Sequence, residues 1–121
     1  MRELINNFKR FDIVLVDFGS EAIDSEQSGI RPGLIVQNDM GNTYSSTTIV
    51  LPLSTVKKKL TQPTHALIKK GKEKGLEKDS VLLGECIRQI SEKRIIKYMG
   101  RVTNSKEQKA IKAAYDANFG E

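Results

Sequence analysis

A chain of 121 residues is long enough to form one domain with its own core, without support from disulfides or a structural metal. A single Cys and a single His exclude an internal disulfide and a metal centre of the Cys and His type. The carboxylates are scattered rather than paired, which argues against a two-metal nuclease centre.

Charge is unevenly distributed along the chain, although the formal net charge is only +5. Residues 1–56 hold four Lys and Arg against seven Asp and Glu, whereas residues 57–121 hold sixteen against eight. The lysines clustered at 57–59 and 69–78 indicate a surface that attracts phosphate and supplies salt-dependent affinity for nucleic acid. A solvated lysine-rich loop is the equally weighted alternative.

Hydrophobic patterning bears on localisation. No apolar run approaches the roughly 18 residues of a membrane span. Residues 1–8 also lack the apolar centre of a signal peptide. We therefore expect a cytoplasmic protein.

The first part of the chain predicts two strands separated by a long polar loop. Residues 12–18 are rich in β-branched side chains, and residues 31–37 are almost continuously apolar, which is typical of a strand buried on both faces. The loop at 19–29 is long for a connection in a small domain, and loops of this length are usually functional or mobile.

A third strand is predicted at 47–53, and a turn centred at 42–43 would fold it back on the second strand. Opposed residues of an antiparallel pair have numbers with a constant sum, which here pairs Arg31 with Ser54 at about 5 Å. The connecting segment does not fix its own turn type, so a shift of about two residues stays open. Pro52 lacks a ladder donor, which favours a sheet edge or bulge near Ser54.

The second half predicts shorter elements and one clear helix. The helix begins at Ser105, where Gln108 completes a capping box, and Gly120 is suited to end it. Its apolar face, which we expect to pack on the sheet, consists of Ile111, Ala114, Tyr115 and Phe119. The other predicted elements are strands at 64–68, 80–86 and 96–102 and one helical turn at 91–95.

Cys86 lies in the apolar run 81–87. A buried thiol is much more common in such a run than a catalytic thiol. We interpret Cys86 as a core residue.

Several segments resemble one protein family, in the same order along the chain. Residues 25–32 read Ser-Glu-Gln-Ser-Gly-Ile-Arg-Pro, and residues 34–39 read Leu-Ile-Val-Gln-Asn-Asp. Pro-Thr-His at 63–65 and Glu-Cys-Ile-Arg at 85–88 follow. On these segments the chain resembles the MazF/PemK family of toxin endoribonucleases from about residue 11 to residue 119.

The resemblance implies a β-rich α+β fold, namely a compact, SH3-like, partly closed antiparallel β-barrel with a C-terminal helix, as in MazF-like and CcdB-like proteins. It implies one toxin domain at residues 11–121, preceded by an N-terminal extension at residues 1–10. It also implies a homodimer that cuts single-stranded RNA at a short sequence without a metal or other cofactor, leaving a 2′,3′-cyclic phosphate and a 5′-hydroxyl. The implied regulatory partner is a MazE-like antitoxin whose acidic and apolar C-terminal segment fills the RNA groove.

By resemblance, the family's catalytic arginine falls on Arg31 and its catalytic threonine falls on Ser54. Cleavage through the ribose 2′-hydroxyl needs charge stabilisation at phosphorus, and a planar guanidinium can hold two phosphate oxygens at once. Ser54 keeps the hydroxyl but lacks the methyl group that restricts χ1. We therefore expect activity with a less fixed hydroxyl.

Two candidates for proton transfer stay open. A guanidinium is a poor base because its pKa lies above about 12. His65 carries an imidazole, the side chain best suited to proton transfer near neutral pH, although a lone His in a strand is more often structural. Glu85 is the second candidate, and its alternative role is contact with an RNA base or with Arg88.

Further polar residues are candidates for RNA contact, because hydrogen bonds to exposed base edges specify single-stranded RNA. We expect the loop residues to meet splayed bases and the later residues to follow the backbone or base edges. These candidates are Ser25, Glu26 and Gln27 in the loop, followed by Lys57, Gln62 and Arg88.

Two other classes of function stay open at the level of sequence. A CcdB-like gyrase poison has the same general fold but relies on a C-terminal Trp segment, and this chain has no Trp. A nucleic-acid-binding module without chemistry would need only the basic second half of the chain.

Overall fold

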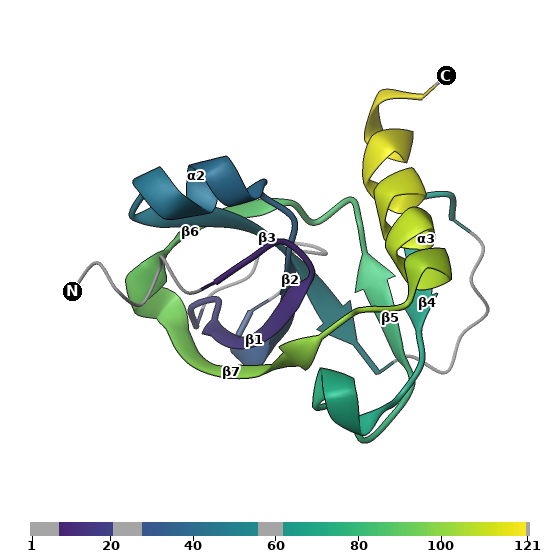
Figure 1. Cartoon of the computed structure of the whole chain (residues 1–121), viewed down its shortest axis with the longest axis horizontal. Helices are drawn as coiled ribbons and strands as arrows, with labels where there is room; N and C mark the ends of the chain where they lie inside the picture. The colour runs from purple at the N-terminus through teal and green to yellow at the C-terminus, as the bar shows by residue number, and fades with distance from the viewer. Residues whose placement is uncertain (1–7, 21–27, 56–61, 121) are drawn as a thin grey trace.

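The computed structural model describes residues 8–20, 28–55 and 62–120. Antiparallel strands form a seven-stranded sheet in the order β4-β5-β3-β2-β1-β7, with β6 paired to β3 (Figure 1). The predicted β-rich α+β fold is confirmed, and the sheet is not closed. The strands are β1 (Asp12–Asp17), β2 (Ile30–Ile35), β3 (Thr47–Ser54), β4 (His65–Ile68), β5 (Ser80–Leu83), β6 (Arg88–Ser91) and β7 (Ile95–Arg101).

Strand β3 is the centre of the sheet. One edge pairs with β2, and the other pairs first with β6 at Thr47–Val50 and then with β5 at Leu53 and Ser54. The prediction that Pro52 marks a sheet edge or bulge is therefore wrong. Pro52 pairs with Gly33 of β2, and on its other edge it lies between the β6 and β5 ladders, where a missing N–H costs little.

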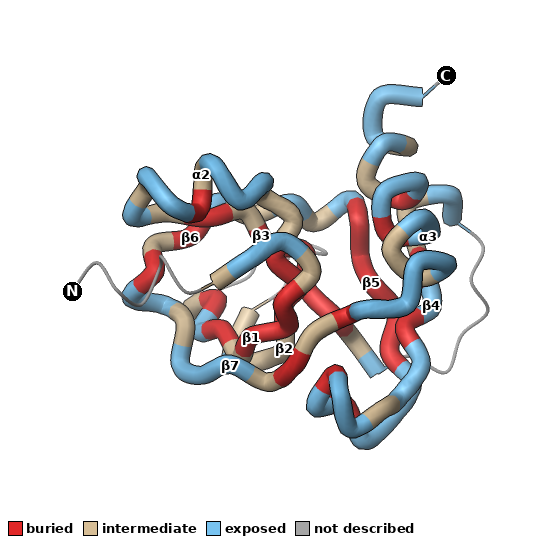
Figure 2. Tube along the Cα trace, viewed as in Figure 1, coloured by how far each residue is buried: buried red, intermediate tan, exposed pale blue. Residues whose placement is uncertain are grey.

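Each face of the sheet carries its own buried cluster, because successive side chains of a strand point to opposite faces. Ile13, Leu34 and Leu51 belong to the cluster that includes Ile111 and Ala114 of the C-terminal helix, so we name their side the helix face. The opposite side, which we name the barrel face, carries the second cluster. That cluster consists of Val14, Val16, Phe18, Ile35, Val50 and Ile90. Figure 2 shows that the buried residues lie mainly along the strands.

The sheet curls around the barrel face. Strands β6 and β1 are separated by β3 and β2 in the hydrogen-bonded order. Nevertheless the guanidinium carbon of Arg88, on β6, lies 5.5 Å from the ring centroid of Phe18, just beyond β1. A short 3-10 helix, η2 (Glu92–Arg94), joins β6 to β7 and confirms the helical turn predicted at 91–95. Strand β6 itself was not predicted.

The connection between β2 and β3 is a short helix, α2 (Asp39–Tyr44), rather than the predicted turn. The side chain of Asn38 caps it by accepting a hydrogen bond from the N–H of Gly41 at 2.8 Å. The buried Asn42 accepts from the hydroxyl of Thr48 at 2.7 Å, which ties the helix to β3. The register between β2 and β3 is nevertheless as predicted. Gly33 pairs with Pro52, and the numbers of paired residues add up to 85 along the ladder.

The C-terminal helix α3 (Ser105–Asp116) lies beside β4 (Figure 1). Its cap is Asn104, whose side chain accepts from the N–H groups of Lys106 and Glu107, so the capping box predicted at Ser105 is wrong by one residue. The prediction that Phe119 packs on the sheet is also wrong. The residue lies in a further 3-10 turn, η3 (Ala117–Phe119), and is 85 % exposed.

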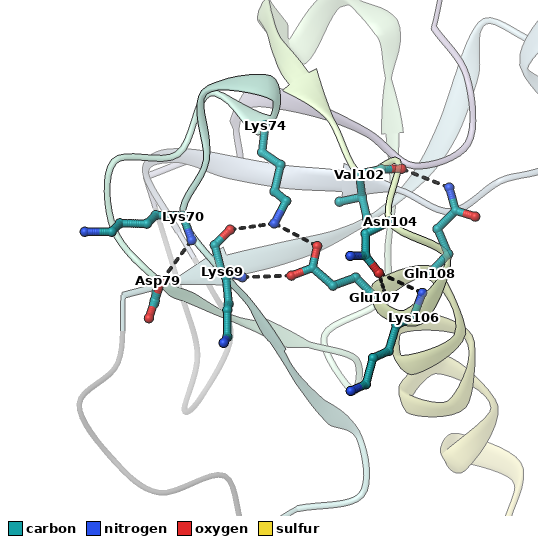
Figure 3. Close-up of polar contacts among 9 residues, drawn as sticks. All are labelled: Lys69, Lys70, Lys74, Asp79, Val102, Asn104, Lys106, Glu107 and Gln108. Atoms are coloured by element: carbon teal, nitrogen blue, oxygen red, sulfur yellow. Dashed lines mark hydrogen bonds and ion pairs between the residues drawn. The ribbon is translucent and has the colours of Figure 1, made fainter.

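A buried ion pair fixes the first turn of α3 to the segment after β4, which contains the 3-10 helix η1 (Lys72–Lys74) (Figure 3). Nζ of Lys74 lies 2.7 Å from Oε1 of Glu107 and donates to the carbonyl of Lys69 at 2.7 Å. The N–H of Lys69 in turn donates to Oε2 of Glu107 at 3.1 Å. The side chains of Lys74 and Glu107 are only 6 % and 15 % exposed.

Candidate active site

Arg31 lies where β2 leaves the long loop. It pairs with Val16 of β1, so its side chain starts from the barrel face at the rim of the curled sheet. Its Nε donates to the carbonyl of Ser28 at 3.1 Å, and the residue is partly buried. The guanidinium is therefore held by the loop end rather than extended freely into solvent.

Ser54 lies on the same face as Arg31. The β2–β3 ladder ends at Gly33 and Pro52, and the same register continued by two residues aligns Arg31 with Ser54. On its other edge Ser54 pairs with Val81 of β5. The predicted proximity of Arg31 and Ser54 therefore follows from the observed register, because these are the next residues on the same face after the last pair.

Hydrogen bonds close the base of the long loop, which we name the loop neck and define as residues 17–19 and 28–30. The N–H of Phe18 donates to the carbonyl of Gly29 at 2.9 Å, and the N–H of Gly29 donates to the carbonyl of Gly19 at 2.6 Å. Gly19 and Gly29 have φ values of 98° and 79°, which glycine adopts far more readily than other residues. The neck is thus a defined structure directly beside Arg31.

His65 and Glu85, the two candidates for proton transfer, are in contact. Nε2 of His65 lies 3.2 Å from Oε2 of Glu85, and the hydroxyl of Thr64 donates to Oε1 at 2.9 Å. Glu85 lies in a turn after β5, which ends at Leu83 rather than at Cys86 as predicted. This turn brings the carboxylate of Glu85 back to His65 on β4.

The pKa of Glu85 is lowered. Desolvation acts to raise this pKa, but hydrogen bonds from its own backbone N–H, from His65 and from Thr64, with the charge of His65, outweigh the burial. An ionised carboxylate only accepts, so Nε2 of His65 then carries the hydrogen and donates it. Glu85 therefore orients the imidazole of His65 through Nε2.

The pairings put His65 on the barrel face too. Ser54 pairs with Val81, which pairs with Leu67 of β4. His65 lies two residues before Leu67, so its side chain is on the same face as that of Ser54. Strand β4 is separated from β2 by β5 and β3 in the strand order. In the strand order, Arg31 and His65 therefore lie on either side of β3, the strand that carries Ser54.

The remaining candidates are only partly placed. Arg88 joins the rim through Phe18, and its Nη2 makes a long contact of 3.5 Å with the carbonyl of that residue. Gln62 is exposed, shortly before β4. Four candidates lie outside the described residues, namely Ser25, Glu26, Gln27 and Lys57.

Cys86 is half-buried and belongs to neither buried cluster, so its interpretation as a core residue is only partly right. Desolvation raises the pKa of the thiol, and the charge of Glu85 raises it further. Both effects keep the sulfur protonated, which disfavours a nucleophilic role.

Two residues of this region escaped prediction. Thr64 precedes β4 and gave no signal beyond its place beside His65. Arg94 lies in η2 and donates from Nη1 to the carbonyl of Asp17 at 3.1 Å, across 77 positions of sequence.

Within the described ranges no group of three or more His, Cys, Asp or Glu is arranged to hold a metal ion. The described helices include none that is long and apolar enough to cross a membrane.

Residues 9–117 match the model of the family described as PemK-like, MazF-like toxins of type II toxin-antitoxin systems. The chain belongs to this family. It is 41% identical over 112 residues to Endoribonuclease MazF of Staphylococcus saprophyticus, covering 93% of this chain and 91% of the relative. It is 44% identical over 87 residues to Endoribonuclease EndoA of Bacillus subtilis, covering 72% and 73%.

Solved MazF structures share the fold of this MazF-like chain. MazF from Deinococcus radiodurans superimposes with a TM-score of 0.76 at 16% identity, covering 94% of this chain and 97% of the other. A mycobacterial endoribonuclease in complex with its cognate antitoxin gives 0.74 at 20% identity, covering 93% and 95%. The MazF/PemK resemblance drawn from the sequence is confirmed.

Proposed function

We propose that this protein is a sequence-specific endoribonuclease toxin that cleaves single-stranded RNA without a metal ion. The ribose 2′-hydroxyl attacks the adjacent phosphorus, the bond to the 5′-oxygen of the next nucleotide breaks, and a 2′,3′-cyclic phosphate and a 5′-hydroxyl result. The observation that carries the proposal is the register of β2 and β3, which, continued by two residues beyond the last pair, aligns Arg31 with Ser54 on the barrel face, away from α3. Names of relatives at 41% and 44% identity support the same activity.

Arg31 is the electrostatic catalyst in this proposal. Its planar fork holds two non-bridging phosphate oxygens and binds them more tightly as charge develops. A single donor of this kind contributes about 3–4 kcal/mol to transition-state stabilisation. Ser54 donates its hydroxyl to the same phosphate and fixes its orientation.

His65 is the group to which we assign proton transfer, and Glu85 positions it. Glu85 is the poorer choice because its lowered pKa keeps it ionised and its oxygens already accept from Thr64 and His65. The same contacts orient the imidazole, as a carboxylate does in other histidine-dependent enzymes. One proton must leave the 2′-hydroxyl and one must reach the departing 5′-oxygen, and His65 serves one of these transfers.

Recognition of the RNA bases falls to the loop and its surroundings. Ser25, Glu26 and Gln27 contact splayed bases, while Lys57, Gln62 and Arg88 follow the backbone or base edges. Arg88 supports this assignment through its place on the rim beside Phe18. Hydrogen bonds to base edges give the sequence preference.

We also propose a cytoplasmic homodimer neutralised by a MazE-like antitoxin with an acidic, apolar segment. The net charge of +5 suits an acidic partner. Two fold relatives support a partner of this type, since one is an endoribonuclease bound to its cognate antitoxin and another is a MazE-MazF complex.

Incubation of the purified protein with mixed single-stranded RNA in EDTA tests the proposed function. We expect cuts at one short sequence, with cyclic phosphate on one side of each cut and 5′-hydroxyl on the other. An oligonucleotide with deoxyribose at the cut position should bind but stay intact, because it lacks the attacking hydroxyl. Intact RNA under all conditions would contradict the proposal and leave a gyrase poison or a binding module.

A further inference from the structure

Three arginines, distant in sequence, donate to backbone carbonyls at the loop neck. Arg94 donates from Nη1 to Asp17 at 3.1 Å, and Arg31 donates from Nε to Ser28 at 3.1 Å. Arg88 contacts the carbonyl of Phe18 at 3.5 Å. Both ends of the loop are therefore held by guanidinium groups, and one of these groups is the proposed catalyst.

A continuous series of contacts links Arg94 to Arg31. Asp17, whose carbonyl accepts from Arg94, also accepts through Oδ1 from the N–H of Gly19 at 2.9 Å. The carbonyl of Gly19 accepts from the N–H of Gly29 at 2.6 Å. Ser28, the neighbour of Gly29, then accepts from Nε of Arg31.

The neck needs such support because its backbone is unusual. Both Gly19 and Gly29 have positive φ values. Glycine also has the largest conformational freedom of any residue in the unfolded state, so it loses the most on folding. A guanidinium that stabilises a transition state must also be placed closely, since a misplacement of about 1 Å costs about a hundredfold in rate. Loss of one neck contact should therefore lower the cleavage rate by displacing the guanidinium of Arg31.

We propose that Arg94 is a positioning residue for RNA cleavage, which holds the Asp17 end of the neck and thereby keeps the guanidinium of Arg31 aimed at the phosphate. This inference rests on the proposed function. Arg94 itself does not touch the reacting atoms. Its competing role is that of an exposed cation that attracts the RNA backbone.

Arg94→Ala and Lys93→Ala form a matched pair, because each removes one exposed cation from η2 but only Arg94 contacts Asp17 through its side chain. Arg94→Ala should lower kcat about tenfold, with KM and the salt dependence of binding close to wild type. Lys93→Ala should leave kcat unchanged. Arg94→Lys, which keeps a donor and a charge, should recover part of the loss.

A direct readout of Arg31 accompanies the kinetics. The Nε–Hε signal of Arg31 in a nitrogen-15 NMR spectrum, assigned with Arg31→Lys, should exchange faster with water in Arg94→Ala but not in Lys93→Ala. If Arg94→Ala fails to fold, Arg94→Lys carries the same comparison at smaller amplitude. This signal reports on positioning even if the wild type cuts no RNA, a result that would defeat the proposed function alone.

Two results would overturn the inference. One is an Arg31 signal and a kcat that are both unchanged in Arg94→Ala. The other is a loss confined to KM with a reduced salt dependence, which would assign Arg94 to direct contact with RNA phosphates.

Discussion

At the scale of single residues, we assign phosphate binding to Arg31 and Ser54, and proton transfer to His65 on another strand of the same face. The β2–β3 register, continued by two residues, aligns Arg31 with Ser54, whereas His65 and Glu85 meet at β4 and the turn after β5. A substrate lying across β3 would meet both sets. Ser54 is the residue between them.

Ser54→Ala should slow RNA cleavage about tenfold, which is less than the loss expected for Arg31→Ala. The reason is that a neutral hydroxyl bonded to a charged phosphate contributes about 1.5 kcal/mol, roughly half the contribution of the guanidinium. Single-turnover rates on one oligonucleotide give the comparison. Ser54→Thr is the matched control and should retain activity, since it keeps the hydroxyl and restricts χ1. Full activity of Ser54→Ala would remove Ser54 from the catalytic residues.

Glu85 should give the protein an acid-dependent share of its stability. Its folded-state pKa lies below the ordinary 4.5, so the ionised form stabilises the fold. That contribution is fully present above the unfolded pKa and is lost as pH falls through the folded pKa. Urea unfolding at several pH values should therefore show a gap in stability between wild type and Glu85→Gln that narrows as the pH falls below 4.5. A gap that does not narrow below 4.5 would contradict this prediction.

At the scale of elements, α3 stabilises the fold and lies on the face opposite the site. It covers the helix face through Ile111 and Ala114, and its first turn holds the segment after β4 through Lys74 and Glu107 (Figure 3). Its effect on activity should therefore come through stability alone.

Glu107→Ala should lower the free energy of unfolding by about 3 kcal/mol, because it leaves the buried ammonium of Lys74 without its carboxylate. Chemical denaturation of the two proteins measures the difference. Asp116→Ala is the control, since the pair it breaks with Lys112 has side chains 52 % and 76 % exposed and should contribute less than about 0.5 kcal/mol. Equal losses in the two variants would show that the buried pair has no special weight.

Elements with strong local patterns were predicted well from the sequence, whereas elements defined by distant contacts were not. The strands around Val14 and Leu51 followed from β-branched and apolar runs. Helix α2 left the β2–β3 register unchanged because it is centred where the turn was expected. Strand β6 was missed because its short polar sequence becomes a strand only by pairing with β3.

The candidate site shows the same division. Arg31 and Ser54 were aligned by register arithmetic, which depends only on the two strands and their connection. The contact between His65 and Glu85 depends on a turn that folds back across 20 positions, and local sequence carries no signal for it. Arg94 is more distant still from the backbone that it holds.

At the scale of the whole molecule, we propose that the two faces of one sheet divide stability from chemistry. The helix face is covered by α3, and the barrel face carries the rim with Arg31 and Arg88, followed by Ser54 and His65. We expect lysines of the second half of the chain to add a long-range attraction for an anionic polymer. Binding should therefore depend on salt, while the chemical step depends on the rim.

The catalytic role of Arg31 is measured by the rate at which Arg31→Ala cleaves an RNA oligonucleotide in EDTA. We expect a folded variant whose single-turnover rate is at least about a hundredfold below wild type, because the main stabilisation of the phosphate charge is gone. Circular dichroism and thermal unfolding should match the wild type. A folded Arg31→Ala variant that cuts the same sequence at the wild-type rate would contradict this role.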